Sequence, residues 1–348
     1  MKQLTRIFVI LLVVCLFSVS AMATGRAQEE LHVLSWTGYV DVDTLADFEA
    51  ETGIKVVWSP MESPEDMLLK ITQTGGEGYD LILSSDYSLE VLIKEKLVAT
   101  LDTAKLANYA NLDPAFLSQP YDPANAYVIP YTAGCMVIIY DPTYIPFEIT
   151  GYNDLWREEL IDSIALIDNG RVMGGITFKS MGLSMNEIDD ERLTVMGEKL
   201  AKLAPNVRTY NDESTYSALV TGDASVSFTY AVFASMAYAE NPALKVVYPE
   251  EGLGFGVDGF VLSAKSKNTD NAYAFLDYLM RPEVAAHNAE MQGYMCVNQA
   301  AKPFLSEAYL SNPSINVPSE ALANAEIIMD VGSVAVRYQE LFDALKLQ

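Results

Sequence analysis

Residues 31–58 constrain the fold of this chain most, because a strand pattern and a helix pattern follow each other there within one short segment. Residues 31–34 form a mostly apolar run that predicts a buried strand. Asp43 is placed to cap a helix with Phe48 on its apolar face, and Gly53 is placed to end that helix. The segment therefore predicts one strand-helix unit of an α/β sheet.

Three side chains suited to ligand contact lie between that strand and that helix. Trp36, Thr37 and Tyr39 follow the strand at its carboxyl end, and ligands of open α/β sheets bind outside the carboxyl ends of strands. Packing explains large aromatic side chains at such a position as readily as binding does. The position thus indicates a candidate ligand site without defining its ligand.

The first 27 residues have the pattern of a secretory signal peptide. A basic start precedes an apolar run over residues 7–17, which is shorter than the roughly 20 residues of a membrane span. Small residues end at Ala23, and Ala27 is a second candidate cleavage position. We therefore expect an exported, periplasmic protein.

Acidic residues dominate the charge. Cleavage would remove Lys2, Arg6 and Arg26 and change the formal charge from −25 to −28. A surface of this sign repels nucleic acid and attracts cations, although solubility explains most such carboxylates. No nucleic-acid partner is predicted.

Strand and helix signals alternate along the rest of the chain, which is the pattern of sheets covered by helices. Ser63 and Pro64 mark a strong helix start. Residues 79–83 predict a buried strand, and Ser85 and Tyr87 follow it as the aromatic cluster follows the first strand. A mature chain of about 320 residues exceeds one usual core, so two domains are expected. Later elements are expected as strands at residues 224–228, 245–248 and 259–262 and as helices at residues 88–96, 186–203, 270–280 and 282–291.

A longer apolar passage covers residues 127–140 in the middle of the chain. Pro130 and Gly134 interrupt it, so the pattern predicts two strand segments joined by a bend. Cys135 lies in this passage and Cys296 in a later turn; buried free thiols are expected there, and an exported protein would also permit a disulfide.

Catalytic motifs are nearly absent. His32 and His287 are the only histidines and lack the spacing of a metal pair, so no metal site is predicted. Residues 254–259 match the G-x-G-x-x-G pattern, but a strand pattern follows where a dinucleotide site needs a helix. The sequence therefore predicts a binding protein without a cofactor, not an enzyme.

Aromatic side chains and scattered carboxylates remain, a combination typical of sites for organic cations. A ring face attracts an ammonium group by roughly 0.5 to 2 kcal/mol, and a carboxylate adds a charge-assisted hydrogen bond. Asp258, in a Gly-rich apolar segment, is the best candidate for the amine-binding carboxylate. The alternative is a turn Asp that bonds to its own backbone.

Several motifs together resemble one known family. They include S-W-T-G-Y at residues 35–39, E-T-G-I-K-V at residues 51–56, D-L-W at 154–156, R-P-E-V-A at 281–285 and D-V-G at 330–332. In these motifs and their order, the chain resembles the periplasmic spermidine/putrescine-binding proteins of ABC importers.

This resemblance implies an α/β fold of the type II periplasmic binding class, with two α/β lobes joined by a hinge that closes on a small ligand. Lobe 1 would comprise residues 28–133 and 255–302, and lobe 2 residues 134–254 and 303–348. The protein would be a monomer that delivers putrescine, spermidine or a related amine to the membrane permease of an importer.

The resemblance also implies which residues line the ligand site. They are Trp36, Thr37, Tyr39, Ser85, Tyr87, Tyr230, Asp258 and Tyr294, with Asn169 and Asp212 near the expected lining.

This chain departs from the family at several of its ligand positions. Gly38 and Val172 replace acids, Asn169 replaces a third, Gly256 replaces an aromatic residue, and Ile328 replaces a polar contact. Asp168, Asp212 and Glu213 are candidates to replace the missing acids. A shorter diamine, a monoamine or another small ligand, including an anion near Arg171, is therefore an alternative, and a secreted hydrolase is the alternative from another class.

Overall fold

Eleven strands form one hydrogen-bonded sheet, whose main path runs β2-β1-β3-β9-β4-β7-β5-β6. The computed structural model describes residues 28–211 and 215–348, so the predicted leader, Asp212 and Glu213 lie outside the described residues. The strands are β1 (Glu29–Ser35), β2 (Ile54–Pro60), β3 (Leu81–Ser84), β4 (Val128–Tyr140), β5 (Ile164–Leu166), β6 (Val207–Tyr210), β7 (Val226–Tyr230), β8 (Lys245–Val247), β9 (Gly254–Leu262), β10 (Met295–Cys296) and β11 (Glu326–Ile327).

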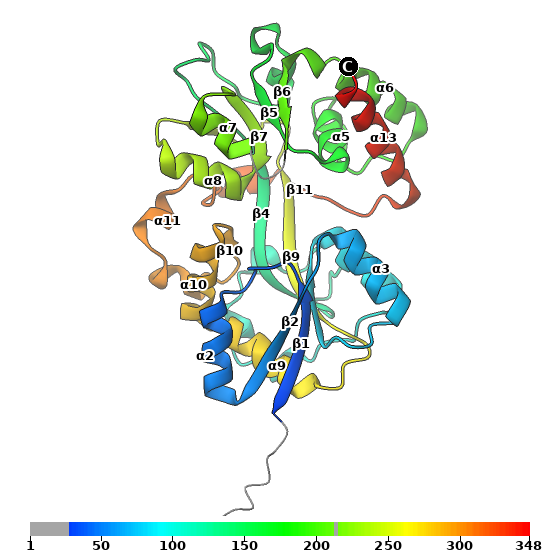
Figure 1. The fold of residues 1–348 in the computed structure, drawn as a ribbon, viewed down its shortest axis with the longest axis vertical. Coiled ribbons are helices and arrows are strands. Elements are labelled where there is room, and N and C mark those ends of the chain that lie inside the picture. Colours follow the sequence, from blue (N-terminus) through cyan, green and yellow to red (C-terminus); the bar gives the residue numbers. More distant parts are fainter. Residues whose placement is uncertain (1–27, 212–214) are drawn as a thin grey trace, which may run out of the picture.

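Helices surround this sheet in two groups, which gives the molecule two lobes stacked along its long axis (Figure 1). The first lobe is built on β1, β2 and β3, and the second on β5, β6 and β7. The α-helices are α2 (Val42–Thr52), α3 (Pro64–Thr74), α4 (Asp86–Lys94), α5 (Gly170–Lys179), α6 (Asp190–Ala201), α7 (Thr215–Thr221), α8 (Ala231–Glu240), α9 (Thr269–Leu279), α10 (Pro282–Gln292), α11 (Glu307–Ser311), α12 (Ser319–Leu322) and α13 (Ala335–Lys346).

The strands β4 and β9 run between the lobes (Figure 1). The first part of β4 pairs with β9, and its last residues pair with β7 and β8 of the second lobe. The prediction of two segments joined by a bend is wrong, because β4 is one strand of 13 residues. Pro130 is accommodated at a register shift before Thr132, so the missing N–H donor does not break the strand.

Local sequence signals explain most helix ends. Ser63 accepts a hydrogen bond from the backbone N–H of Asp66 and caps α3, as predicted. Gly53 ends α2 in the left-handed conformation, with φ of 75°. The predicted cap of α2 is wrong by two residues, since the Asp41 side chain accepts from the N–H of Asp43. Residues 254–259 lie inside β9, which confirms that the glycine pattern is not a dinucleotide loop.

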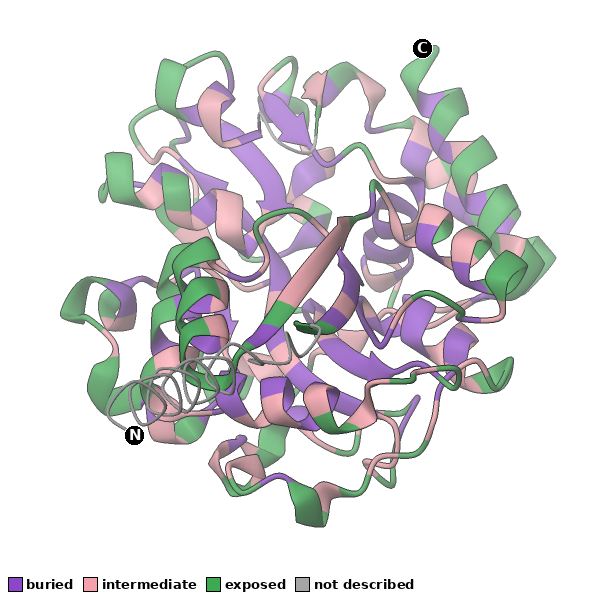
Figure 2. Cartoon of the chain, turned by 60° about the horizontal axis from the view of Figure 1, so that its bottom comes forward, coloured by how far each residue is buried: buried purple, intermediate pink, exposed green. Residues whose placement is uncertain are grey.

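The apolar cores lie between the strands and the inner faces of the helices, and Figure 2 shows buried strands inside helices with exposed outer faces. In the first lobe, the rings of Phe48 on α2 and Phe275 on α9 pack with centroids 5.0 Å apart. In the second lobe, Phe178 and Tyr338 pack at 5.9 Å.

Asp80 fixes the start of β3 against β1 and against the chain before α9. Its carboxylate accepts hydrogen bonds from the backbone N–H of His32 at 2.9 Å, from the Ser266 hydroxyl at 2.8 Å and from the Asn268 side chain at 3.1 Å. Asp80 is only 3% exposed. This buried carboxylate therefore holds in place the strand whose other end carries the aromatic cluster.

Candidate ligand-binding site

The aromatic cluster lies at the carboxyl end of β1, as the sequence predicts. The Trp58 indole N–H donates to the backbone carbonyl of Trp36 at 3.0 Å and holds the chain where it leaves the sheet. The rings of Trp36 and Tyr39 then lie 4.7 Å apart, centroid to centroid, while Thr37 is exposed. The two rings form an aromatic wall at this sheet edge.

Asp258 meets this wall from β9. The Tyr39 hydroxyl donates to Asp258 Oδ2 at 2.9 Å, and the rings of Tyr39 and Tyr294 lie 6.1 Å apart. Gly134 of β4 makes room for the Tyr294 ring, because a Cβ at this glycine would lie 3.2 Å from it. Residues more than 200 positions apart in sequence thus converge, with a separation of 219 between Tyr39 and Asp258.

The orientation of Asp258 follows from strand periodicity. Phe255 and Val257 are buried, whereas Gly256 and Asp258 are partly exposed on the opposite face of β9. The alternative interpretation of Asp258 as a turn residue bonded to its own backbone is wrong, because it lies in the strand opposite Thr132.

Burial and the hydrogen bond from Tyr39 set the ionisation of the site. Burial raises the pKa of Asp258 to about 6, and the hydrogen bond from Tyr39 opposes that rise. Burial raises the pKa of Tyr294 to about 12, with a further contribution from the Asp258 charge. Within residues 28–211 and 215–348, Asp258 forms no ion pair, so its charge has a hydrogen-bond donor and no cation.

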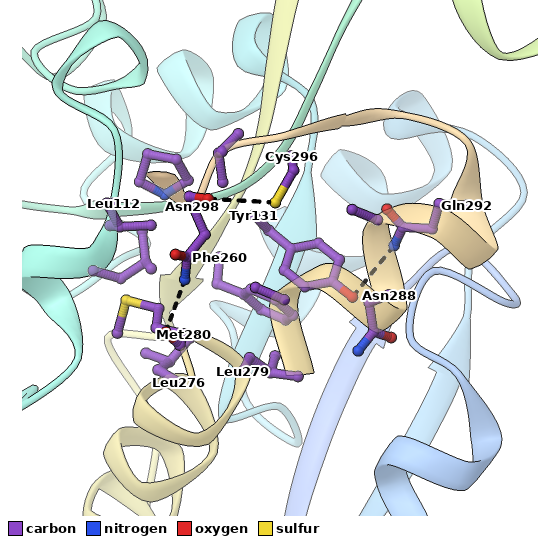
Figure 3. A pocket seen from close by; sticks show the side chains of 15 residues that line it. Leu112, Tyr131, Phe260, Leu276, Leu279, Met280, Asn288, Gln292, Cys296 and Asn298 are labelled. Atoms are coloured by element: carbon purple, nitrogen blue, oxygen red, sulfur yellow. Dashed lines mark hydrogen bonds between the residues drawn. The ribbon is translucent and has the colours of Figure 1, made fainter. Parts of the chain in front are cut away.

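Side chains behind the wall hold the backbone of Tyr39. The Tyr131 hydroxyl donates to the Tyr39 carbonyl at 2.9 Å, the Gln292 amide donates to the same oxygen, and Gln292 also donates to the Tyr131 hydroxyl at 3.3 Å (Figure 3). The cavity that these two residues help to line has a volume of about 20 Å³, room for one water molecule. This cavity supports the wall and is too small for an amine ligand.

The second polar cluster follows β3, where Ser85 precedes α4. Its hydroxyl is buried and has no hydrogen-bond partner among the residues that the structure describes, and it does not cap the helix. The Tyr87 hydroxyl donates to Glu65 at 2.8 Å. Tyr230, at the end of β7 in the second lobe, is close enough to contribute to a raised pKa of Tyr87, although burial is the larger cause. Both lobes thus supply groups to one region.

Two acidic candidates of the second lobe are not placed with this group. The Asn169 side chain accepts from the N–H of Val172 and caps α5. Asp168, considered as a replacement acid, is exposed and binds Lys346 at 2.6 and 2.8 Å. The third candidate, Asp212, lies outside the described residues.

Arg171 is engaged by neighbouring oxygen atoms. Its guanidinium donates to the Met185 carbonyl at 2.8 Å, to the Asn186 side chain and to the Met329 carbonyl at 3.2 Å. Three acceptors therefore already occupy the cation that kept an anionic ligand open as an alternative.

Sequence reasoning missed one carboxylate of this region. Asp86 is the first residue of α4 and is 4% exposed. Burial raises its pKa, and the nearby Asp258 charge raises it further. The available signal was its position directly between Ser85 and Tyr87, after a buried strand.

Two α/β lobes linked by long strands, with ligand-type side chains from both lobes, define a two-lobed binding protein. Residues 43–316 match the family model described as bacterial extracellular solute-binding protein, and the chain belongs to this family. No helix in the described residues is long and apolar enough to cross a lipid bilayer.

Relatives of known name support the same class. The spermidine/putrescine-binding periplasmic protein of Salmonella typhimurium is 32% identical over 338 residues, which cover 95% of this chain and 97% of the relative. The putrescine-binding periplasmic protein PotF of Escherichia coli is 30% identical over 88% of each chain.

A solved structure confirms the predicted fold. The spermidine/putrescine ABC transporter substrate-binding protein PotD from Streptococcus pneumoniae superposes with a TM-score of 0.82 and 32% identity, over 92% of this chain and 99% of that one. The type II periplasmic binding fold expected from the sequence is therefore confirmed.

Proposed function

We propose that this protein binds a polyamine such as putrescine or spermidine, or a related small organic amine, between its lobes. One observation carries the proposal. The buried Asp258 carboxylate lies against the aromatic wall, accepts a hydrogen bond from Tyr39 and has no cation partner in the described parts of the chain. An ammonium group supplies the missing charge, and the rings of Trp36 and Tyr294 offer faces for cation-π contact.

The proposal includes how the protein works. It binds without catalysis, closes its lobes over the ligand and presents it as a monomer to the permease of an ABC importer. The predicted leader would export it to the periplasm. The lobes are taken as residues 28–133 with 255–302, and residues 134–254 with 303–348.

Titration calorimetry of ligand-stripped mature protein tests the proposal. Putrescine, spermidine, monoamines and amino acids are titrated at low and moderate salt. We expect a one-to-one complex of micromolar or tighter affinity with at least one diamine or polyamine. Tight binding of an amino acid or small anion, with no heat from any amine, would contradict the proposal while leaving the family assignment intact.

The replaced family positions favour the shorter amines within this class. Gly38 has φ of 77°, which disfavours other residues there, and Val172 is buried with Asn169 committed to a helix cap. Fewer acids along the site leave fewer partners for a third amine, so putrescine is expected to bind at least as tightly as spermidine.

Replacing Trp36 tests the aromatic wall. Trp36→Ala is expected to weaken amine binding about tenfold, because ring stacking and a cation-π contact of roughly 1 to 2 kcal/mol are lost. Trp36→Phe keeps an aromatic face and should retain most of the affinity. Calorimetry with both variants decides the point, and equal affinities of the alanine variant and the unaltered protein would exclude Trp36 from the site.

Amine binding should depend on pH through Asp258. Its pKa of about 6 in the free protein means that protons compete with the ammonium below that value. Affinity is therefore expected to rise about tenfold per pH unit up to about 6 and to level off above 7. In the free protein, the raised pKa makes folding stability fall as the pH rises toward 6, because the unfolded chain releases this proton more easily. A flat affinity profile from pH 5 to 8 would contradict this assignment.

A further inference from the structure

A second buried carboxylate lies beside Asp258. Asp86 begins α4, directly after the sheet edge that carries Ser85, and only 4% of it is exposed. Its Oδ1 accepts the backbone N–H of Tyr87 at 2.8 Å. No salt bridge joins Asp86 to a basic side chain in the described residues, so the carboxylate is buried without a bound cation.

Gly256 places the Asp86 carboxylate on the same face as Asp258. A Cβ at Gly256 would lie 3.2 Å from Asp86 Oδ2, so this oxygen rests over the glycine. Gly256 and Asp258 are two residues apart on β9 and present the same face of the strand. Asp86 therefore occupies the space in which the residue at position 256 would otherwise project, next to Asp258.

Other groups confirm that the two carboxylates share one environment. The Tyr121 hydroxyl donates to the Val257 carbonyl at 3.4 Å, and after burial the charges of Asp86 and Asp258 are the next causes of its raised pKa. Arg171 of α5 contributes favourably to Asp86. Its N–H groups are bonded to other oxygens, as described above, and it forms no printed contact with Asp86.

We propose that Asp86 is a second ligand carboxylate, which takes up one primary ammonium group together with Asp258. The inference rests on the proposed function and names the group that the site recognises. Two like charges buried side by side are unfavourable in the free protein. A cation between them removes that cost, which gives the pair a reason to exist in a binding site.

The chemistry of the acceptors favours a primary ammonium. Such a group has three N–H donors, and the pair of carboxylates supplies acceptors on two sides of it. The buried Ser85 hydroxyl, which has no partner among the described residues, is a third acceptor adjacent in sequence to Asp86. A quaternary ammonium has no donors and leaves these oxygens unsatisfied, so the site should discriminate against it.

A structural role for Asp86 makes an opposite prediction about stability. An acid in the first turn of a helix stabilises the helix through its dipole, and the bond from Tyr87 would add to this. Removing a purely structural acid lowers stability, whereas removing one of two crowded ligand carboxylates leaves the free protein equally or more stable. Stability and affinity measured on the same variant therefore separate the two roles.

The experiment compares Asp86→Asn with Glu95→Gln, which neutralises an exposed acid just after the same helix. Calorimetry with putrescine measures affinity, and thermal unfolding of the ligand-free proteins measures stability. We expect Asp86→Asn to weaken putrescine binding at least tenfold with an unchanged or higher melting temperature. Glu95→Gln should bind within twofold of the unaltered protein.

Each other outcome overturns the inference in a recognisable way. Binding by Asp86→Asn within twofold of the control, or weaker binding with a fall in melting temperature of several degrees, assigns Asp86 a structural role while the proposed function stands. Failure of the unaltered protein to bind any amine removes the proposed function and the inference together.

A second variant covers the case in which Asp86→Asn does not fold. Gly256→Ala adds a methyl group 3.2 Å from Asp86 Oδ2 and displaces that carboxylate by a few tenths of an ångström. It is expected to weaken putrescine binding several-fold and to leave the fold intact. Unaltered putrescine affinity in this variant would overturn the inference.

Discussion

Asp258→Asn is expected to abolish measurable amine binding while the protein still folds. Removing one partner of a buried, hydrogen-bonded charge pair costs about 2 to 5 kcal/mol, a loss of roughly 30-fold to several thousand-fold in affinity. Asn keeps the shape and an acceptor oxygen for the Tyr39 hydroxyl, so the aromatic wall should stay in place. The lost property is the negative charge, which burial makes costly in the free protein.

Calorimetry with putrescine and thermal unfolding of the free protein measure both effects of Asp258→Asn. Asp47→Asn removes the same charge from an exposed position on α2 of the same lobe and serves as the matched control. The control should bind normally. Micromolar affinity in the Asp258 variant would mean that the amine is held elsewhere and that the aromatic wall is a packing feature.

The sequence predicted the elements with strong local signals. The helix beginning after Ser63 and the helix ending at Gly53 lie where capping chemistry places them. The carboxyl end of β1 could be found because an apolar run stops at aromatic residues, and Trp36 and Tyr39 lie there. These predictions depend on residues near one another in the chain, which is why they could be made from sequence alone.

The features that sequence missed depend on contacts between distant segments. Whether β4 is one strand or two is decided by its partners β9 and β7, which accommodate Pro130 at a register shift. The placement of Asp86 against Gly256 joins positions 170 residues apart, and nothing local to either residue predicts it. Asn169 matched a ligand position by resemblance, yet its side chain is committed to capping α5.

Asp80→Ala is expected to destabilise the folded protein by about 3 kcal/mol. The substitution leaves the backbone N–H groups of His32, Lys267 and Asn268 without their acceptor, and each buried unsatisfied donor costs about 1 to 3 kcal/mol. Burial alone would raise the pKa of Asp80, but these bonds and that from the Ser266 hydroxyl outweigh burial and hold the pKa below its usual value. The carboxylate therefore stabilises the fold in its charged form.

This ionisation gives the Asp80 prediction a pH signature. Because the folded pKa is lowered, the stabilisation is fully present above the unfolded pKa of about 4 and is lost as the pH falls through the folded pKa. Chemical unfolding of Asp80→Ala and of the exposed control Asp47→Ala should differ by about 3 kcal/mol at pH 7 and by progressively less below about pH 4. Since Asp80 anchors the strand that ends at Trp36, amine affinity should fall with stability only when the variant begins to unfold. A gap between the two variants that stays constant down to pH 2 would show that the lost contacts are those of packing and not those of the carboxylate.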